Sequence, residues 1–187
     1  MILRIDDVSS NTDLTELKKI LNYIVIVDQI KEVIVGINLF SKSNIFSSVY
    51  PNPPFKNKPM EYFYDVDSIL PLSVISSFGF VNIASHGLLH VDHSQIHRHA
   101  QEISIITSCN LLCTKKFIPP FNKYDYNTLS ICNQYGIDVL KPEDGWKSMD
   151  KSAFVDNDFD INYKYWYMHP WRWTFGKFKA FIDSKIN

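Results

Sequence analysis

The sequence predicts an α/β fold with a largely parallel sheet flanked by helices. Short β-branched or apolar runs, typical of buried strands, alternate with stretches in which apolar residues recur at helical spacing. The 187 residues show no internal repeat and no interdomain linker, so we expect one domain over residues 1–187. An open doubly wound sheet and a closed barrel both fit this order. In either fold, functional side chains gather at the C-terminal ends of the strands.

Periodicity and end signals place the elements of the first half. A strand at 2–5 precedes a helix for which Asn11, Thr12 and Asp13 offer capping side chains, with Glu16 three residues after Asp13. The run 32–40 is apolar and β-branched, which is typical of a strand buried on both faces. Residues 41–61 are rich in Ser, Asn and Pro and form a long loop, a kind of segment that is often functional. A helix at 67–77 and a strand at 80–84 follow.

The second half continues the alternation. A helix at 94–112 leads to a strand at 117–122 that stops at a double proline, because proline cannot donate to a ladder. The remaining elements are a helix at 126–134 that Gly136 ends, a strand at 137–140, a turn at 144–146, a strand at 163–168, and a last helix from Thr174 to about Ile186.

Composition and charge exclude several classes of protein. Hydrophobic residues make up 45% of the chain, which argues against a disordered protein. The 19 Lys and Arg residues against 20 Asp and Glu form no basic stripe, so we expect no nucleic-acid partner. The three cysteines lack a framework spacing and indicate reduced thiols, with Cys109 and Cys113 in the core. The sequence shows no signal peptide and no transmembrane segment, which predicts a soluble, cytoplasmic protein.

Polar or unusual residues directly follow four of the predicted strands, namely Asp6-Asp7, His86, Pro119-Pro120 and His169. Because the C-terminal ends of parallel strands share an edge, we expect them to form one site. The aspartate pair alone would be a solvated turn. At a strand end its two side chains diverge, so one carboxylate can bind a metal while the other acts as a base.

His86 and His90 are candidate metal ligands. Together with Asp7 they offer the carboxylate and imidazole donors that zinc takes where it keeps a position open for water. The four-residue interval lets both rings converge on one ion if a helical turn forms after Gly87. Two partly buried histidines satisfied by hydrogen bonds are the alternative interpretation.

Three further histidines lie close in sequence, at His93, His97 and His99. A continuous helix would put His93 and His97 on one face with the earlier pair, which would give a His-rich metal site without Asp7. We favour a position at the surface or behind the ligands for all three, because the segment around His97 is polar.

His169 lies among Trp166, Trp171 and Trp173. An imidazole beside an apolar wall can have a pKa suited to proton transfer at neutral pH. A core histidine packed against tryptophans is an equally good interpretation of this residue alone.

Taken together, the motifs resemble the polysaccharide deacetylases of the NodB homology type, also called carbohydrate esterase family four. The stretches that carry the resemblance appear in family order between residues 4 and 173: Arg4-Ile5-Asp6-Asp7, Ser85-His86-Gly87-Leu88-Leu89-His90, Ile118-Pro119-Pro120-Phe121-Asn122 and Met168-His169. Asp144-Gly145-Trp146 meets a further family motif only loosely.

The resemblance implies a distorted (β/α) barrel with about seven parallel strands. It also implies a metal-dependent hydrolase that removes an N-acetyl group from a sugar or glycan intermediate. Asp7, His86 and His90 would hold a divalent metal, most often Zn2+, whose bound water attacks the acetamide carbonyl. Asp6 would be the general base and His169 the general acid. The substrate would lie against Pro120, Phe121, Asn122, Trp146 and Trp171, and the backbone N–H of Phe121 would help to hold the oxyanion.

Two positions depart from the family pattern. Ile118 stands where the third motif usually has an arginine that supports the catalytic aspartate, and Asn122 replaces the usual glycine. We interpret the Pro-Pro-Phe-Asn form as a divergent branch of the family. Lys123, Arg4 and Arg172 are candidates for the missing positive charge.

Two functions from different classes stay open. The first is an intracellular deacetylase of a nucleotide- or lipid-linked sugar or glycan intermediate, a setting that suggests association with glycan-assembly enzymes. The second is a non-catalytic relative that keeps the fold and binds a glycan or a partner enzyme. Asp6 and His169 favour the first, because a binding module needs neither. A metal-dependent hydrolase of another amide or ester is a third option.

Overall fold

The structure is a computed structural model that describes residues 1–9, 12–39, 70–88, 90–152, 160 and 162–186. The loop expected at 41–61 and the start of the helix expected at 67 lie outside the described residues. Among the described residues, no helix has the length and apolar character needed to cross a membrane.

Seven parallel strands form one curled sheet in the order β5-β4-β3-β2-β1-β7-β6. The strands are β1 (Ile2–Val8), β2 (Glu32–Ile37), β3 (Val81–Ser85), β4 (Lys116–Phe117), β5 (Asp138–Val139), β6 (Lys147–Ser148) and β7 (Tyr165–Met168). In the part of the chain that the structure describes, no pairing joins β5 to β6, so the sheet is a distorted, open barrel. The predicted parallel sheet and the seven-stranded barrel are both confirmed.

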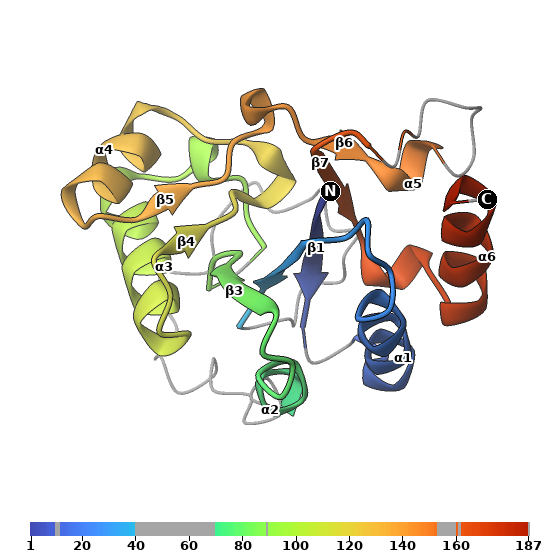
Figure 1. The fold of residues 1–187 in the computed structure, drawn as a ribbon. Coiled ribbons are helices and arrows are strands. Elements are labelled where there is room, and N and C mark those ends of the chain that lie inside the picture. Colours follow the sequence, from blue (N-terminus) through green and yellow to red (C-terminus); the bar gives the residue numbers. More distant parts are fainter. Residues whose placement is uncertain (10–11, 40–69, 89, 153–159, 161, 187) are drawn as a thin grey trace.

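Helices line the outer side of this sheet (Figure 1). They are α1 (Leu14–Ile24), α2 (Leu70–Ile75), α3 (Arg98–Leu111), α4 (Tyr126–Gln134), the short α5 (Met149–Ser152) and α6 (Phe175–Ile186). Asp13 caps α1 as predicted, since its carboxylate accepts hydrogen bonds from the backbone N–H groups of Thr15 and Glu16. The carboxylate of Asp125 caps α4 in the same way by accepting from Thr128.

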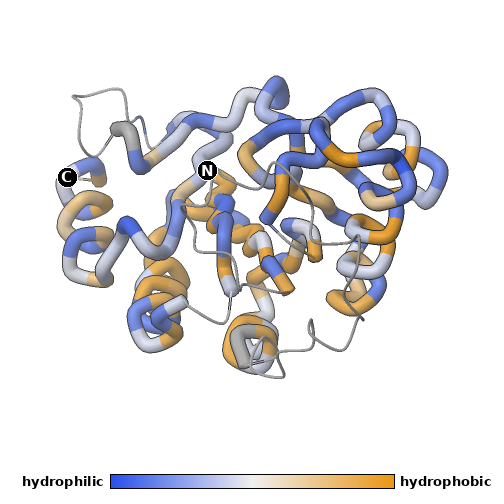
Figure 2. The backbone as a smooth tube through the Cα atoms, turned by 180° about the vertical axis from the view of Figure 1, so that it is seen from behind, coloured by the Kyte–Doolittle hydropathy of each residue, from blue (hydrophilic) through white to orange (hydrophobic). Residues whose placement is uncertain are grey.

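Alternate residues along the strands face opposite sides of the sheet. Leu3 and Ile5 of β1 belong to the main core. Ile34, Ala84 and Ile118 form a separate apolar cluster with Trp146 packed against it. Figure 2 shows hydrophobic residues running along the central strands and the flanking helices, whereas the outer turns are largely hydrophilic. Ile2 also packs against this second cluster, and the next residue on the same face of β1 is the fully buried Arg4.

The prediction of a helix at 94–112 is wrong about where the helix begins. His93–Gln95 is a separate 3-10 turn, and α3 begins at Arg98 after extended backbone at Ile96 and His97. The buried Gln101 side chain donates to the Ile96 carbonyl oxygen at 3.1 Å. A carbonyl satisfied in this way needs no helical partner, so the chain can turn before α3.

Several shorter expectations also differ from the structure. The strand expected at 117–122 ends at Phe117, and Pro120–Asn122 forms a 3-10 turn. Cys113 is exposed and not in the core, whereas Cys109 is buried as predicted. The strand β6 and helix α5 were not predicted, because two and four residues are too short for a periodic pattern.

Candidate metal centre and catalytic cavity

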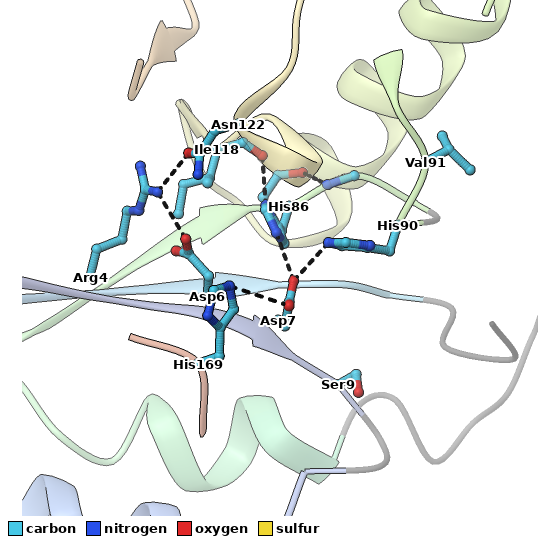
Figure 3. Close-up of polar contacts among 12 residues, drawn as sticks. Arg4, Asp6, Asp7, Ser9, His86, His90, Val91, Ile118, Asn122 and His169 are labelled. Carbon is cyan, nitrogen blue, oxygen red and sulfur yellow. Dashed lines mark hydrogen bonds and ion pairs between the residues drawn. The ribbon is translucent and has the colours of Figure 1, made fainter. Parts of the chain in front are cut away.

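A cavity of about 160 Å3 lies at the C-terminal ends of the strands. Its lining comes from four separate segments of the chain, which are drawn together in Figure 3. The lining residues are Asp6, Asp7, His86, His90, Phe121, Asn122, His169 and Trp171. Pro120 and Trp146 are not among them. The parallel arrangement of the strands thus brings together most of the residues expected to form a site.

Asp7 occupies an irregular position in β1. The register between β1 and β2 shifts between Ile5 and Val8, and Asp7 has a φ of 59°, in the left-handed region that is uncommon for residues other than glycine. The bulge breaks the alternation of the strand, so Asp6 and Asp7 reach different partners. Strain of this kind at a non-glycine residue is typical of functional sites.

His86 is fixed by the strands on both sides of β3. Its backbone N–H donates to the Ile37 carbonyl oxygen at 2.9 Å, and its Nδ1 lies 2.7 Å from the Ile118 carbonyl oxygen. Gly87 then turns the chain with a φ of 88°, a conformation that a side chain would strain. Only 2% of His86 is exposed, so its ring has a single orientation toward Asp7.

The partners of the His86 ring favour a cation at its second nitrogen. A carbonyl oxygen can only accept, so Nδ1 must donate to Ile118. A neutral ring then has a bare lone pair on Nε2, and this atom lies 2.9 Å from Asp7 Oδ1. Two acceptors at that separation repel unless the ring is fully protonated or a cation lies beside them. A carbonyl behind a histidine is also the usual way to fix the tautomer of a metal ligand.

His90 completes the group. Its Nε2 lies 2.9 Å from the same Asp7 oxygen, and its ring packs edge-on against Phe121 at 4.3 Å between centroids. Residues 86–88 and 90 form no helical turn, so the expected reason for convergence was wrong. The turn at Gly87 brings the rings together instead.

The donor set fits a divalent metal. One ligand atom from each of Asp7, His86 and His90 can be chosen so that all lie within 4.8 Å of one another. Two imidazoles and a carboxylate leave a fourth tetrahedral position open, as in catalytic zinc sites. Burial would raise the pKa of Asp7, but hydrogen bonds and charge from the two histidines outweigh burial and hold that pKa well below its usual range. Asp7 is therefore ionised and ready to bind a cation.

His169 is held by Asp150, a residue that the sequence did not single out. Its Nδ1–H donates to Asp150 Oδ2, while Trp173 Nε1 donates to the other carboxylate oxygen at 2.7 Å. The Nε2 atom of His169 then faces the cavity, 3.6 Å from Asp7 Oδ2. Asp150 lies in α5, and no local pattern distinguishes it from the other acidic residues.

Two opposing effects set the pKa of His169. Burial alone would lower it, because a low dielectric disfavours the imidazolium. The hydrogen bond to Asp150 and the negative charges of Asp7 and Asp6 outweigh burial, so the pKa of His169 is raised above its usual value. A protonated Nε2 in the cavity can donate to a leaving group.

Asp6 has a different environment. Its Oδ2 accepts from Arg4 Nη2 at 2.9 Å, whereas its Oδ1 has no hydrogen-bond partner in the structure. Of the three cations considered from the sequence, Arg4 is therefore the one that contacts this carboxylate. Lys123 pairs instead with Asp92 at 3.3 Å, and Arg172 lies over the Trp171 ring.

Aromatic and turn residues form the rim. Phe121 and Asn122 have φ angles of 57° and 55°, so two adjacent non-glycine residues adopt the left-handed backbone conformation here. Phe121 and Trp171 line the cavity and are 46% and 40% exposed, which leaves their rings accessible to a ligand. Trp146 lies over the Arg4 guanidinium, 4.8 Å from ring centroid to Cζ.

The loop that carries His90 is supported by a buried hydrogen-bond network. His93 is fully buried, so it does not lie at the surface. Its Nδ1 bonds to the Val91 carbonyl at 3.0 Å, and its Nε2 bonds to Ser104 Oγ at 3.1 Å. Ser104 Oγ in turn accepts from the Leu88 N–H at 3.2 Å. This network holds the chain on both sides of His90 and requires a neutral His93.

Acid is therefore expected to destabilise the fold through His93. Burial lowers its pKa from 6.5 to about 4, so the unfolded chain binds a proton between these values while the folded chain does not. Stability falls as pH drops through this window, by up to about 3 kcal/mol from this group. Urea unfolding in chelator at pH 7 and pH 4.5 should show a smaller loss for His93→Gln than for the wild type. Equal losses in both proteins would contradict this assignment.

Neither a family model nor a curated protein matches the sequence. Solved structures do match. A CE4 family pseudoenzyme from Bacillus anthracis superposes with a TM-score of 0.63 at 11% identity, over 100% of this chain and 59% of that one. A family 4 carbohydrate esterase from Streptomyces lividans, in complex with acetate, gives 0.57 at 13% identity, over 95% and 81%.

A mutant of the Bacillus pseudoenzyme with restored enzymatic activity gives a TM-score of 0.59 at 13% identity, over 100% of this chain and 61% of that one. This chain thus spans about three fifths of the length of the pseudoenzyme structures. At such identities the likeness shows the fold alone. The chain has the fold of CE4 carbohydrate esterases.

Proposed function

We propose that this protein is a metal-dependent hydrolase of the polysaccharide deacetylase type, which removes an N-acetyl group from a sugar or glycan intermediate. The observation that carries the proposal is the cavity itself. It combines a three-residue donor set with the imidazole of His169 and with the carboxylate of Asp6, whose buried Oδ1 has no hydrogen-bond partner. The cavity lies at the C-terminal ends of the strands, the edge at which chemistry gathers in parallel barrels, and this supports the proposal.

Asp7, His86 and His90 are the proposed ligands. A bound Zn2+ or similar ion would supply Lewis acidity, which polarises the acetamide carbonyl and makes water nucleophilic near neutral pH. The chain supplies the orientation, because the Ile118 carbonyl and the bulge at Asp7 fix the positions of the donor atoms. An amide needs this activation because its carbonyl carbon is a poor electrophile and its amine is a poor leaving group.

Asp6 is the proposed general base. Its Oδ1 accepts a proton from the water as the oxygen attacks the carbonyl carbon. His169 is the proposed general acid, and its Nε2–H donates to the sugar nitrogen as the C–N bond breaks. The products are acetate and a free amine. The Asp150 carboxylate keeps the proton-donating nitrogen directed into the cavity and stabilises the imidazolium.

Phe121 and Trp171 are the proposed walls for the sugar. Both rings are accessible at the rim, and flat apolar faces of this kind pack well against pyranose rings. Pro120 and Asn122 would act through the turn that presents Phe121, whose N–H we propose as an oxyanion donor. Trp146 would act indirectly, by packing on Arg4. Enzymes that assemble glycans in the cytoplasm are the partners that this function suggests.

A non-catalytic glycan-binding relative is the second candidate, and the pseudoenzyme among the similar structures makes it a real alternative. Such a module needs neither an unpaired carboxylate oxygen at Asp6 nor a hydrogen-bonded Asp150–His169 pair aimed at the cavity. These two features therefore favour the catalytic proposal.

Acetate release tests the proposal. We expect the zinc- or cobalt-loaded protein to release acetate from N-acetylated sugars, nucleotide-linked ones included, and to stop when a chelator removes the metal. His169→Ala should lose about 10^2–10^4-fold in amide hydrolysis, because the amine leaves only when protonated. The same variant should retain most hydrolysis of 4-nitrophenyl acetate, whose leaving group needs no acid.

The comparison of the two substrates makes the test selective. A parallel loss on the ester and the amide would indicate a general structural defect and would remove His169 from the acid role. Glycan binding without acetate release from any acetylated sugar, in protein shown to contain metal, would favour the non-catalytic relative. His99→Ala, which alters an exposed histidine outside the cavity, is the matched control.

A further inference from the structure

Arg4 lies at the centre of the contacts beneath the cavity. The residue is fully buried, and its Nη2 donates to Asp6 Oδ2 and to Asn122 Oδ1, each at 2.9 Å. Its Nη1 donates to the Leu140 carbonyl oxygen at 3.2 Å. The guanidinium thus joins β1 to two segments that follow β4 and β5. Figure 3 shows its contacts with Asp6 and Asn122.

Aromatic rings hold the guanidinium in place. The Trp146 and Tyr167 ring centroids lie 4.8 and 5.1 Å from Arg4 Cζ. Cation–π contacts of this kind strengthen when they are desolvated, and they restrict the planar group to one orientation. Arg4 therefore has the rigidity that a positioning residue needs.

The strand geometry explains why the cation comes from β1. Arg4 and Asp6 are two residues apart and share one face of the strand. The space beside Asp6 on the β2 side is closed, since a Cβ on Gly36 would lie 2.8 Å from Ile118 Cδ1 and 3.6 Å from Asp6 Oδ1. Ile118 fills this space with an apolar side chain, which leaves the inner face of β1 as the source of positive charge.

We propose that Arg4 is the positioning residue of this site and that it couples the Asp6 carboxylate to the Phe121–Asn122 turn. The proposal rests on the proposed function, in which Asp6 is the base. By binding Oδ2, Arg4 leaves Oδ1 as the oxygen that accepts a proton. By binding Asn122, it holds a left-handed pair of residues that would otherwise relax. A single side chain thereby sets the relative position of the base and the rim.

Kinetics with a metal assay test the coupling. We expect Arg4→Met to lower kcat by about 10^2–10^3-fold while KM and zinc affinity change by less than about threefold, because only orientation is lost. Arg4→Lys should lower kcat by a smaller factor, since lysine keeps the positive charge but lacks the planar set of N–H donors of the guanidinium. Asn122→Ala should cause a smaller loss that is not additive with Arg4→Lys, because both changes break one network. Arg98→Met, at an exposed arginine of α3, is the matched control.

Relocating the charge gives an independent check. In the double variant Arg4→Met with Ile118→Arg, the new cation would reach Asp6 from the end of β4. We expect the kcat of this double variant to be at least about tenfold higher than that of Arg4→Met. If Arg4→Met does not fold, Arg4→Lys and Asn122→Ala still test the coupling. A kcat within twofold of wild type for both of these variants would overturn the proposal.

Crystal structures separate this proposal from the proposed function. In Arg4→Lys or Asn122→Ala we expect the Asp6 carboxylate to rotate or the 121–122 turn to leave the left-handed region. An unchanged Asp6 rotamer and unchanged φ angles at 121–122 in both variants would overturn the coupling, whether or not the protein is an enzyme. A wild type with ordered Asp6 but without hydrolase activity would instead overturn the proposed function and leave the positioning role standing.

Discussion

Replacing Asp6 by asparagine is expected to lower kcat by about 10^2–10^4-fold while the metal stays bound. The amide keeps an oxygen that accepts from Arg4, so the local structure is preserved, but the NH2 group that replaces Oδ1 cannot take a proton from water. The ion pairs of His86 and His90 in the structure are with Asp7, whereas that of Asp6 is with Arg4, so we expect the donor set to be unaffected. Steady-state kinetics on an N-acetylated sugar and metal analysis of the same samples give both quantities.

The control for this variant is Asp138→Asn, which removes an exposed carboxylate at the edge strand β5. It should leave kcat unchanged. If Asp6→Asn retained more than a tenth of wild-type kcat, another group would have to accept the proton. If it lost its metal, Asp6 would belong to the coordination sphere and its assignment as base would fail.

The second large effect is expected on metal binding. His86→Ala removes one of three protein donors and should weaken zinc affinity by more than the ~10–100-fold that follows loss of an outer hydrogen-bond partner. Hydrolysis should then disappear at metal concentrations that saturate the wild type. Competition with a chromogenic chelator measures the affinity directly.

Thermal unfolding gives a second measurement that does not depend on activity. A ligand that binds only the folded state at 1,000 times its Kd stabilises that state by about 4.1 kcal/mol, so zinc should raise the Tm of the wild type markedly. It should raise the Tm of His86→Ala little, and that of His97→Ala, at an exposed histidine, as much as the wild type. Zinc affinity equal to wild type in folded His86→Ala would remove this residue from the ligand set.

Much of the site could be anticipated from residues that follow apolar runs. Asp6-Asp7, His86 and His169 are found at the C-terminal ends of β1, β3 and β7, because a buried strand leaves a clear local signal and parallel strands share their edges. Asp150 could not be anticipated, since β6 and α5 are too short to produce a pattern. Which of the three cations contacts Asp6 also depends on the tertiary structure, which brings Arg4 to its carboxylate.

By itself, the sequence determined the alternation of strands and helices, the parallel sheet and the strand ends at which polar side chains appear, because each of these depends on neighbours a few residues apart. Only the tertiary structure decided which groups touch. The Asp7–His86 contact spans 79 positions, and the Arg4–Asn122 contact spans 118. The bulge at Asp7 and the left-handed turn at Phe121 are conformations that strain non-glycine residues locally. They persist because contacts from distant strands hold them, and no local pattern encodes such contacts.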